Sequence, residues 1–151
     1  MTPEEAYNST LEKTDEVLEY YSRHLKKKLK EIYGENYSLE YVKTPKYYDY
    51  DATFYLNGER KLNVEVKVRD DITLNQYSQT KLPFRKHAVS LAYFTYREIK
   101  TVYLVLFSDC VAVLNLHEKP DNVKDMVARW DRGNDSAEYA MYDVTRFTQI
   151  G

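Results

Sequence analysis

Apolar and polar side chains recur with helical spacing over the first part of the chain. Apolar or neutral residues stand every three or four positions from Tyr7 to Ile32, which is one stripe of an amphipathic helix. Thr2, followed by a proline and two glutamates, is typical of a helix start, and Gly34 is typical of a helix end. Acidic residues gather at the beginning of this segment and basic residues at its end, as the helix dipole favours. The pattern predicts a long helix over residues 1–34.

Strand-like patterns follow this helix. Residues 37–43 alternate between apolar and polar side chains, and two further alternating runs flank Asn57-Gly58. Residues 101–107 are apolar on both faces, which predicts a central strand that is covered on both sides. Shorter apolar runs predict strands at residues 111–116 and 139–144.

Helical spacing returns after the two runs that flank Asn57-Gly58 and before the apolar run at residues 101–107. Thr73 or Asn75 can cap a helix that runs through about Lys81. Pro83 interrupts this helix or restarts it, because proline has no N–H for the helical ladder. Residues 84–95 then place their apolar side chains on one helical face.

The order of these elements is typical of an α/β fold. It predicts a central mixed β-sheet flanked by helices, and 151 residues suit a single domain over residues 1–151. We expect an N-terminal helix over residues 1–34, the core sheet and its helix over residues 37–116, and a C-terminal helix and strand over residues 120–151. The last helix is expected to run from Pro120 through Trp130.

The two strands that flank Asn57-Gly58 each carry apolar side chains on one face and polar side chains, acids among them, on the other. Matching their apolar faces sets the register, and this requires a three-residue loop or a β-bulge instead of a simple two-residue turn. This register pairs Phe54 with Leu62, Ala52 with Val64, Tyr50 with Val66, Asp51 with Glu65, and Asp49 with Lys67.

Such a pairing favours metal-dependent chemistry. Two carboxylates on directly opposed residues, whose Cβ atoms are about 5 Å apart, repel each other unless a cation lies between them. Mg²⁺ or Mn²⁺ suits oxygen ligands, and Lys67 beside them could position a water and stabilise charge at phosphorus. The alternative interpretation is a structural hairpin with an exposed polar face, since acid-x-Lys also occurs at residues 59–61 and 98–100.

At these residues the sequence resembles the PD-(D/E)XK nuclease superfamily. Residues 45–51 stand where its Pro-Asp element belongs, and Glu65-Val66-Lys67 stands for its acid-x-Lys element. The resemblance covers residues 9–116 and implies a restriction-endonuclease-like fold and a nuclease activity. It implies that Asp51, Glu65 and the Val66 carbonyl bind Mg²⁺ or Mn²⁺ and that Lys67 is the catalytic lysine. Asp49 is the competing candidate for the aspartate.

The resemblance leaves the subgroup open. Holliday-junction resolvases of this superfamily use a glutamate on an N-terminal helix, which Glu12, Glu16 or Glu19 could supply, but the glycine-rich loop usual in them is absent here. RecB-type members place a glutamine and a tyrosine four residues apart on the following helix. Here Gln76 is followed by Thr80.

Charge is unevenly distributed along the chain. The net charge is −2, yet residues 21–100 carry sixteen basic and ten acidic side chains. A basic middle supports a polyanionic partner, and we expect DNA, with RNA as the alternative. The side chains expected to contact nucleic acid are Lys26, Lys27, Lys46, Arg69, Gln76, Gln79, Lys81, Arg85 and Lys86.

The remaining expectations concern the whole chain. A single cysteine, Cys110, excludes an intramolecular disulfide. The absence of a long apolar run and of a signal sequence predicts a cytoplasmic protein without a membrane partner, and the distribution of the superfamily suggests a virus or mobile element as its source. The rival functions are a non-catalytic nucleic-acid-binding or protein-interaction module on the same fold and a dimer formed through the N-terminal helix. A nuclease homodimer also stays open.

Overall fold

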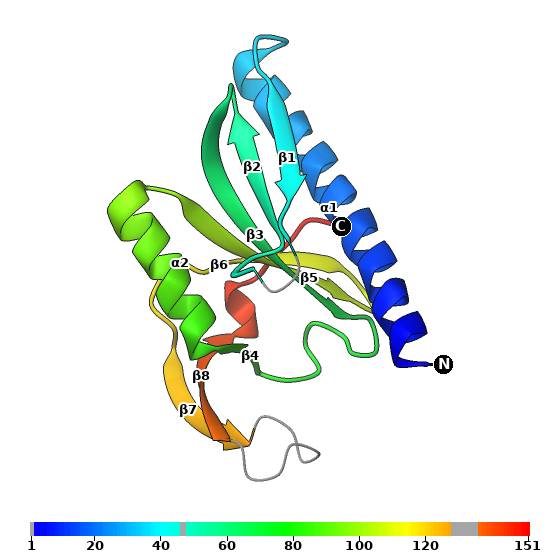
Figure 1. Ribbon diagram of the computed structural model, residues 1–151, viewed down its shortest axis with the longest axis vertical. Coiled ribbons are helices and arrows are strands. Elements are labelled where there is room, and N and C mark those ends of the chain that lie inside the picture. Colours follow the sequence, from blue (N-terminus) through cyan, green and yellow to red (C-terminus); the bar gives the residue numbers. More distant parts are fainter. Residues whose placement is uncertain (1, 46–47, 128–135) are drawn as a thin grey trace.

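The computed structural model describes residues 2–45, 48–127 and 136–151, and Figure 1 shows the elements in chain order. The elements are α1 (Pro3–Tyr33), β1 (Leu39–Lys43), β2 (Ala52–Leu56), β3 (Glu59–Arg69), β4 (Gln79–Pro83), α2 (Phe84–Arg97), β5 (Lys100–Phe107), β6 (Val111–Asn115), β7 (Asn122–Val127), β8 (Ser136–Asp143), the 3-10 helix η2 (Val144–Arg146) and β9 (Thr148–Gln149).

Two β-sheets form the framework. Within the described residues the larger sheet has the strand order β1-β2-β3-β5-β6-β9, and the smaller sheet has the order β4-β8-β7. The central strands β3 and β5 are parallel, whereas the other neighbours in both sheets are antiparallel. The predicted α/β fold with a mixed sheet and flanking helices is therefore confirmed.

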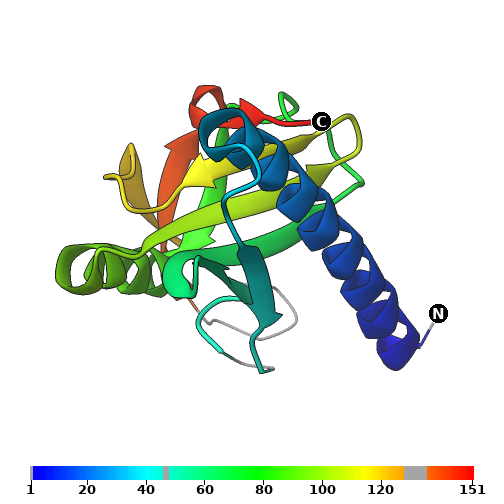
Figure 2. The same ribbon diagram turned by 90° about the horizontal axis from the view of Figure 1, so that it is seen from above.

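The long helix α1 covers one face of the larger sheet. The Thr2 hydroxyl accepts a hydrogen bond from the Glu5 N–H at 3.1 Å, and the chain leaves the helix at Gly34, as the sequence predicted. Leu18 and Tyr21 of α1 pack on Phe54 and other apolar side chains of β2, β3 and β5. Figures 1 and 2 show α1 and α2 on opposite sides of the sheet.

The other face of the larger sheet is covered by the smaller sheet together with α2. Leu82 of β4 and Tyr142 of β8 are buried against Tyr103 and Val105 of β5. His87 of α2 is also buried, and its Nδ1 lies 2.7 Å from the Tyr142 hydroxyl. Because Glu65 and Lys67 point to this face, the smaller sheet and α2 build the walls around them.

The hairpin between β2 and β3 has the predicted register at its base. Ala52 pairs with Val64 and Phe54 pairs with Leu62. Towards the tip, Leu56 pairs with Glu59 across a tight Asn57-Gly58 turn, and the register shifts after Phe54. Both turn residues have positive φ angles of 52° and 80°, as a type I′ turn requires. A two-residue turn and a β-bulge therefore occur together.

The predicted helix over residues 73–81 is wrong. The chain turns over residues 70–78, where the Leu74 N–H donates to Asp109 at 3.1 Å, and then forms the strand β4. Leu82 lies opposite Ala140 of β8 and is 2% exposed. Pairing with a strand that is distant in sequence thus outweighs the local helical pattern, which is ambiguous over so few residues.

The predicted helix from Pro120 through Trp130 is also wrong where the structure describes it. The Asp121 carboxylate accepts from the Asp143 N–H at 2.7 Å, and the Asp121 N–H donates to the Met141 carbonyl at 2.8 Å. The aspartate therefore joins two strands instead of capping a helix, and β7 follows it. Trp130 lies outside the described residues.

Candidate active site

The carboxylate of Asp51 is held against β3 beside Glu65. The Asp51 N–H donates to the Val64 carbonyl at 2.9 Å, and its Oδ2 accepts from the Val66 N–H at 2.6 Å. Glu65 stands between these two β3 residues, and the charges of the two carboxylates act on each other. The strand register thus brings together two acids that lie fourteen residues apart in the chain.

Glu65 does not lie on an exposed face. It is 9% exposed and stands opposite the buried Tyr103 in the register between β3 and β5. By contrast, Glu59 and Lys61, which carry the same acid-x-Lys pattern, are exposed at the hairpin tip, where they form an ion pair of 3.0 Å. This difference argues against the interpretation of Glu65 as part of a solvated hairpin face.

Asp49 and Tyr50 differ from the sequence prediction, because the chain bends before β2 begins at Ala52. Asp49 does not lie opposite Lys67; it forms an exposed ion pair with Arg85 of α2 at 3.1 Å. Tyr50 was expected on the apolar face with Phe54, yet its ring stacks edge-on against Tyr93 of α2, and its hydroxyl accepts from Arg60.

The surroundings of Glu65 and Asp51 raise the pKa of both carboxyls. Burial is the larger cause for Glu65, the charge of Asp51 is the second, and together they raise its pKa to about 7 although Lys86 opposes the change. Burial also raises the pKa of Asp51, against the Val66 N–H and the nearby lysines. A buried pair of acids with a raised pKa is typical of a functional site.

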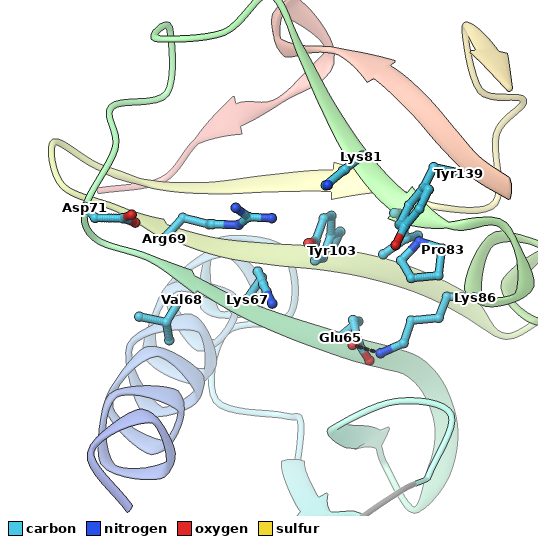
Figure 3. A pocket seen from close by; sticks show the side chains of 11 residues that line it. Glu65, Lys67, Val68, Arg69, Asp71, Lys81, Pro83, Lys86, Tyr103 and Tyr139 are labelled. Carbon is cyan, nitrogen blue, oxygen red and sulfur yellow. Dashed lines mark hydrogen bonds and ion pairs between the residues drawn. The ribbon is translucent and has the colours of Figure 1, made fainter. Parts of the chain in front are cut away.

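Lys86 reaches this pair from a separate element. It lies in the first turn of α2, and its Nζ forms an ion pair with Glu65 Oε1, which Figure 3 marks with a dashed line. Helix α2 begins directly after Pro83 at the end of β4. The position of Lys86 therefore depends on the pairing of β4 with β8.

A cavity of about 550 Å³ opens above Glu65 between β3 and β4. Its charged lining consists of four basic and two acidic side chains, so the cavity favours an anionic ligand. Figure 3 shows Lys67, Arg69 and Lys81 around its centre and Tyr139 with Lys86 at one end. The lining residues are Glu65, Lys67, Val68, Arg69, Asp71, Lys81, Leu82, Pro83, Lys86, Tyr103 and Tyr139.

Lys67 and Val68 line both this cavity and a second one of about 550 Å³ on the side of α1. The second cavity is lined by Asp51, by tyrosine and threonine side chains, and by part of the first turns of α1. Lys67 itself is exposed. Glu65 thus faces the first cavity, Asp51 faces the second, and Lys67 faces both.

The side chains expected to contact nucleic acid fall into two groups. Arg69, Lys81 and Lys86 line the cavity above Glu65. The others do not line it: Lys26 and Lys27 are exposed on α1, Gln76 lies in an exposed turn, Gln79 bonds to Asn122 and Asp143 at 3.0 and 2.9 Å, and Arg85 pairs with Asp49. Lys46 lies outside the described residues.

Sequence reasoning did not single out two tyrosines of the cavity. Tyr103 forms part of its floor because it lies beside Glu65 in the parallel register. Tyr139 of β8 forms part of a wall, and the Lys81 ammonium stands 5.1 Å from its ring centre. The apolar alternation of β5 could have indicated the first residue, whereas the second depends on the smaller sheet, which local patterns did not reveal.

The donor set beside Glu65 fits a hard divalent cation. Within the described ranges no group of three or more histidine, cysteine, aspartate and glutamate side chains gathers that could hold a metal ion. The donors beside Glu65 are its own carboxylate, the carboxylate of Asp51 and backbone oxygens of β3. The N–H and C=O of one strand residue point the same way, so the Val66 carbonyl faces the side on which Asp51 lies. Mg²⁺ and Mn²⁺ accept one or two carboxylates, with water and substrate oxygens as further ligands.

Comparison with known proteins identifies the family of the chain. No curated protein and no solved structure shows significant similarity to the chain. In the part that the structure describes, no helix has the length and apolar character needed to cross a membrane. One family model, described as "Phage putative PDDEXK endonuclease", matches residues 14–150, and this range includes both acids, Lys67 and the smaller sheet. The chain therefore belongs to this phage endonuclease family of the PD-(D/E)XK superfamily.

Proposed function

We propose that this protein is a divalent-metal-dependent endonuclease that hydrolyses phosphodiester bonds in DNA. The observation that carries the proposal is the contact of the Asp51 carboxylate with the Val66 N–H at 2.6 Å. This contact places Asp51 beside the buried Glu65, below a cavity with an excess of basic side chains. Family membership supports a nuclease, and the description of the family as a phage endonuclease is consistent with DNA as the substrate.

Asp51, Glu65 and the Val66 carbonyl are the proposed ligands of Mg²⁺ or Mn²⁺. The bound cation would polarise the scissile phosphate and lower the pKa of a water. Glu65 must be deprotonated to bind it, and burial beside Asp51 makes deprotonation unfavourable until the cation is present. A cation between the two carboxylates would offset the repulsion of their charges.

Lys67 is the proposed catalytic lysine. It follows Glu65 by two residues on the same face of β3 and lines both cavities. From there its ammonium can orient the attacking water and stabilise the charge that develops on the phosphate oxygens. Arg69 and Lys81 line the same space and would bind the phosphate groups that flank the scissile bond.

Cleavage of DNA by matched variants tests this proposal. We expect Glu65→Gln, Asp51→Asn and Lys67→Met each to reduce the cleavage rate by about 100-fold or more, because each removes a ligand or the cation beside the water. Linear, circular, single-stranded and branched DNA would be incubated with Mg²⁺, Mn²⁺ or chelator. Chelator should abolish cleavage by the unaltered protein.

Matched controls come from the same chain. Glu59→Gln and Lys61→Met change an exposed acid-x-Lys pair, and Asp49→Asn changes the aspartate that faces Arg85. These three variants should cleave within about twofold of the unaltered protein, since surface pairs contribute little. Metal-stimulated cleavage that persists in Glu65→Gln and Asp51→Asn would refute the site. DNA binding without cleavage of any substrate would instead favour a non-catalytic binding module.

A further inference from the structure

Lys86 forms the most enclosed lysine–carboxylate pair among the described ion pairs. The side chain of Glu65 is 12% exposed and that of Lys86 is 37% exposed, whereas both partners of the other lysine–carboxylate pairs are 41–83% exposed. Taking two charges out of water costs free energy that their attraction often does not repay. A pair of this kind beside a candidate metal site suggests a functional reason for it.

The neighbouring residue shows what an ordinary contact looks like. Arg85 also pairs with an acid of the Tyr48 to Asp51 segment, but its side chain is 82% exposed and does not line the cavity. Lys86 instead points into the cavity beside Glu65, as Figure 3 shows. Two consecutive helix residues thus make ion pairs of different kinds, and only one of them reaches the candidate site.

The ammonium of Lys86 occupies the kind of position that a divalent cation would take. It contacts Glu65 directly, and its charge also acts on Asp51. A divalent cation bound to Glu65 would repel the nearby Lys86 ammonium and weaken its ion pair with the carboxylate. The flexible four-carbon stem of Lys86 would then allow the ammonium to turn from Glu65 towards another anion in the cavity.

We infer that Lys86 is a second catalytic cation, which neutralises Glu65 in the metal-free protein and binds a non-bridging oxygen of the scissile phosphate once the divalent cation has taken its place. This inference rests on the proposed function. The phosphate would then lie between Lys67 from β3 and Lys86 from α2, which line the same cavity. Lysine is a suitable partner for it, because its ammonium acts as a compact point charge on phosphate.

The inference predicts two effects of opposite sign for Lys86→Met. Removal of a competing charge should tighten Mg²⁺ binding in the absence of DNA, by roughly threefold to tenfold. Loss of the phosphate contact should slow single-turnover cleavage at saturating Mg²⁺ by roughly tenfold to a hundredfold. A merely structural lysine would not give this combination, since a damaged site loses metal affinity and rate together.

The experiment measures Mg²⁺ binding by calorimetry at about pH 9, which is above the raised pKa of Glu65, and cleavage by rapid quench. Lys86→Arg keeps the charge, so it should bind Mg²⁺ within about twofold of the unaltered protein, and it tests the inference if Lys86→Met does not fold. Lys61→Met, which removes an exposed lysine paired with Glu59 at the hairpin tip, is the matched control and should change neither quantity. Unchanged or weaker Mg²⁺ binding in Lys86→Met, or cleavage like that of Lys61→Met, would overturn the inference.

The same measurements separate this inference from the proposed function. If the unaltered protein neither binds Mg²⁺ nor cleaves DNA, the proposed function fails. If the unaltered protein cleaves DNA, Glu65→Gln does not, and Lys86→Met cleaves normally, the inference alone fails. In that case Lys86 is only a structural partner of Glu65.

Discussion

The Glu65 carboxyl couples proton binding to folding. Burial beside Asp51 raises its pKa from 4.5 to about 7. The folded protein therefore holds a proton on this group at pH values where the unfolded chain has released it. The stabilisation from this proton is fully present below about pH 4.5 and is lost as the pH rises through about 7. Above that pH the metal-free protein contains a buried charge that costs folding free energy.

Glu65→Gln should consequently stabilise the metal-free protein at about pH 8. The amide resembles the protonated carboxyl in shape and does not carry the buried charge. We expect the free energy of unfolding to increase by about 1–3 kcal/mol at that pH, and the gain to disappear below about pH 4.5. Urea unfolding in chelator at several pH values measures the difference.

Glu59→Gln is the control for this measurement, since Glu59 is exposed at the hairpin tip. It should alter the free energy of unfolding by less than about 0.5 kcal/mol at every pH. If Glu65→Gln destabilised the protein above pH 7, the ion pair with Lys86 would contribute more than the burial of both charges costs. That result would contradict the raised pKa of Glu65.

The sequence allowed Glu65 and Asp51 to be placed side by side, because strand alternation and apolar matching act over a few residues. It did not place Asp49 or Tyr50, because the chain bends before β2 begins. There Tyr50 contacts Arg60, and Asp49 forms an ion pair with a residue of α2. Nor could it show that Lys86 meets Glu65. That contact depends on how α2 packs over the sheet, and no local pattern encodes it.

The β2–β3 hairpin is the element that fixes the register of the candidate site. Its Asn57-Gly58 turn has two positive φ angles, and the register shift after Phe54 restores the pairing of Ala52 with Val64. Asp51 precedes Ala52 directly, so a slip of one residue would move its carboxylate away from the Val66 N–H. The geometry of the turn and the contact of the two acids are therefore linked.

Gly58→Ala should destabilise the protein by about 1–2 kcal/mol. The φ angle of Gly58 is 80°, a conformation that a residue with a Cβ atom adopts at a cost. A Cβ atom there would meet no other atom within 4 Å, so no steric clash adds to the backbone strain. Urea unfolding at neutral pH measures it.

Gly58→Asn is the matched comparison, because asparagine tolerates positive φ angles better than alanine does. It should cost less than the alanine change, at most about 1 kcal/mol. Equal stability of Gly58→Ala and the unaltered protein would mean that the turn relaxes into another conformation. In that event the turn would not set the register.

The strands β4 and β7 of the smaller sheet show where prediction of secondary structure from local sequence fails. Residues 79–83 and 122–127 are short and mix apolar with charged side chains, so their patterns fit helix or strand. Their conformation is decided by pairing with β8 from both sides, which joins segments far apart in the chain. The long helix α1 and the apolar strand β5 were predictable because their patterns extend over more residues.

At the scale of the whole molecule, the net charge is small, but basic side chains gather around one cavity. The net charge is −2, yet the cavity above Glu65 holds Lys67, Arg69, Lys81 and Lys86 against two acids. The lysines at the far end of α1 are exposed and do not line this cavity. If DNA binds through the cavity, a cation there and a cation on α1 should differ in their effect on affinity.

Salt dependence distinguishes the two locations, because each phosphate that a protein cation neutralises releases counterions from DNA. In a Glu65→Gln background without metal, Lys81→Gln should lower the slope of log affinity against log salt by about one unit, whereas Lys26→Gln should leave it unchanged. Fluorescence anisotropy with a labelled duplex between about 50 and 200 mM salt measures both slopes. Equal reductions would show that α1 also contacts the backbone, and a reduction by Lys26→Gln alone would place the DNA on α1 and away from the acids.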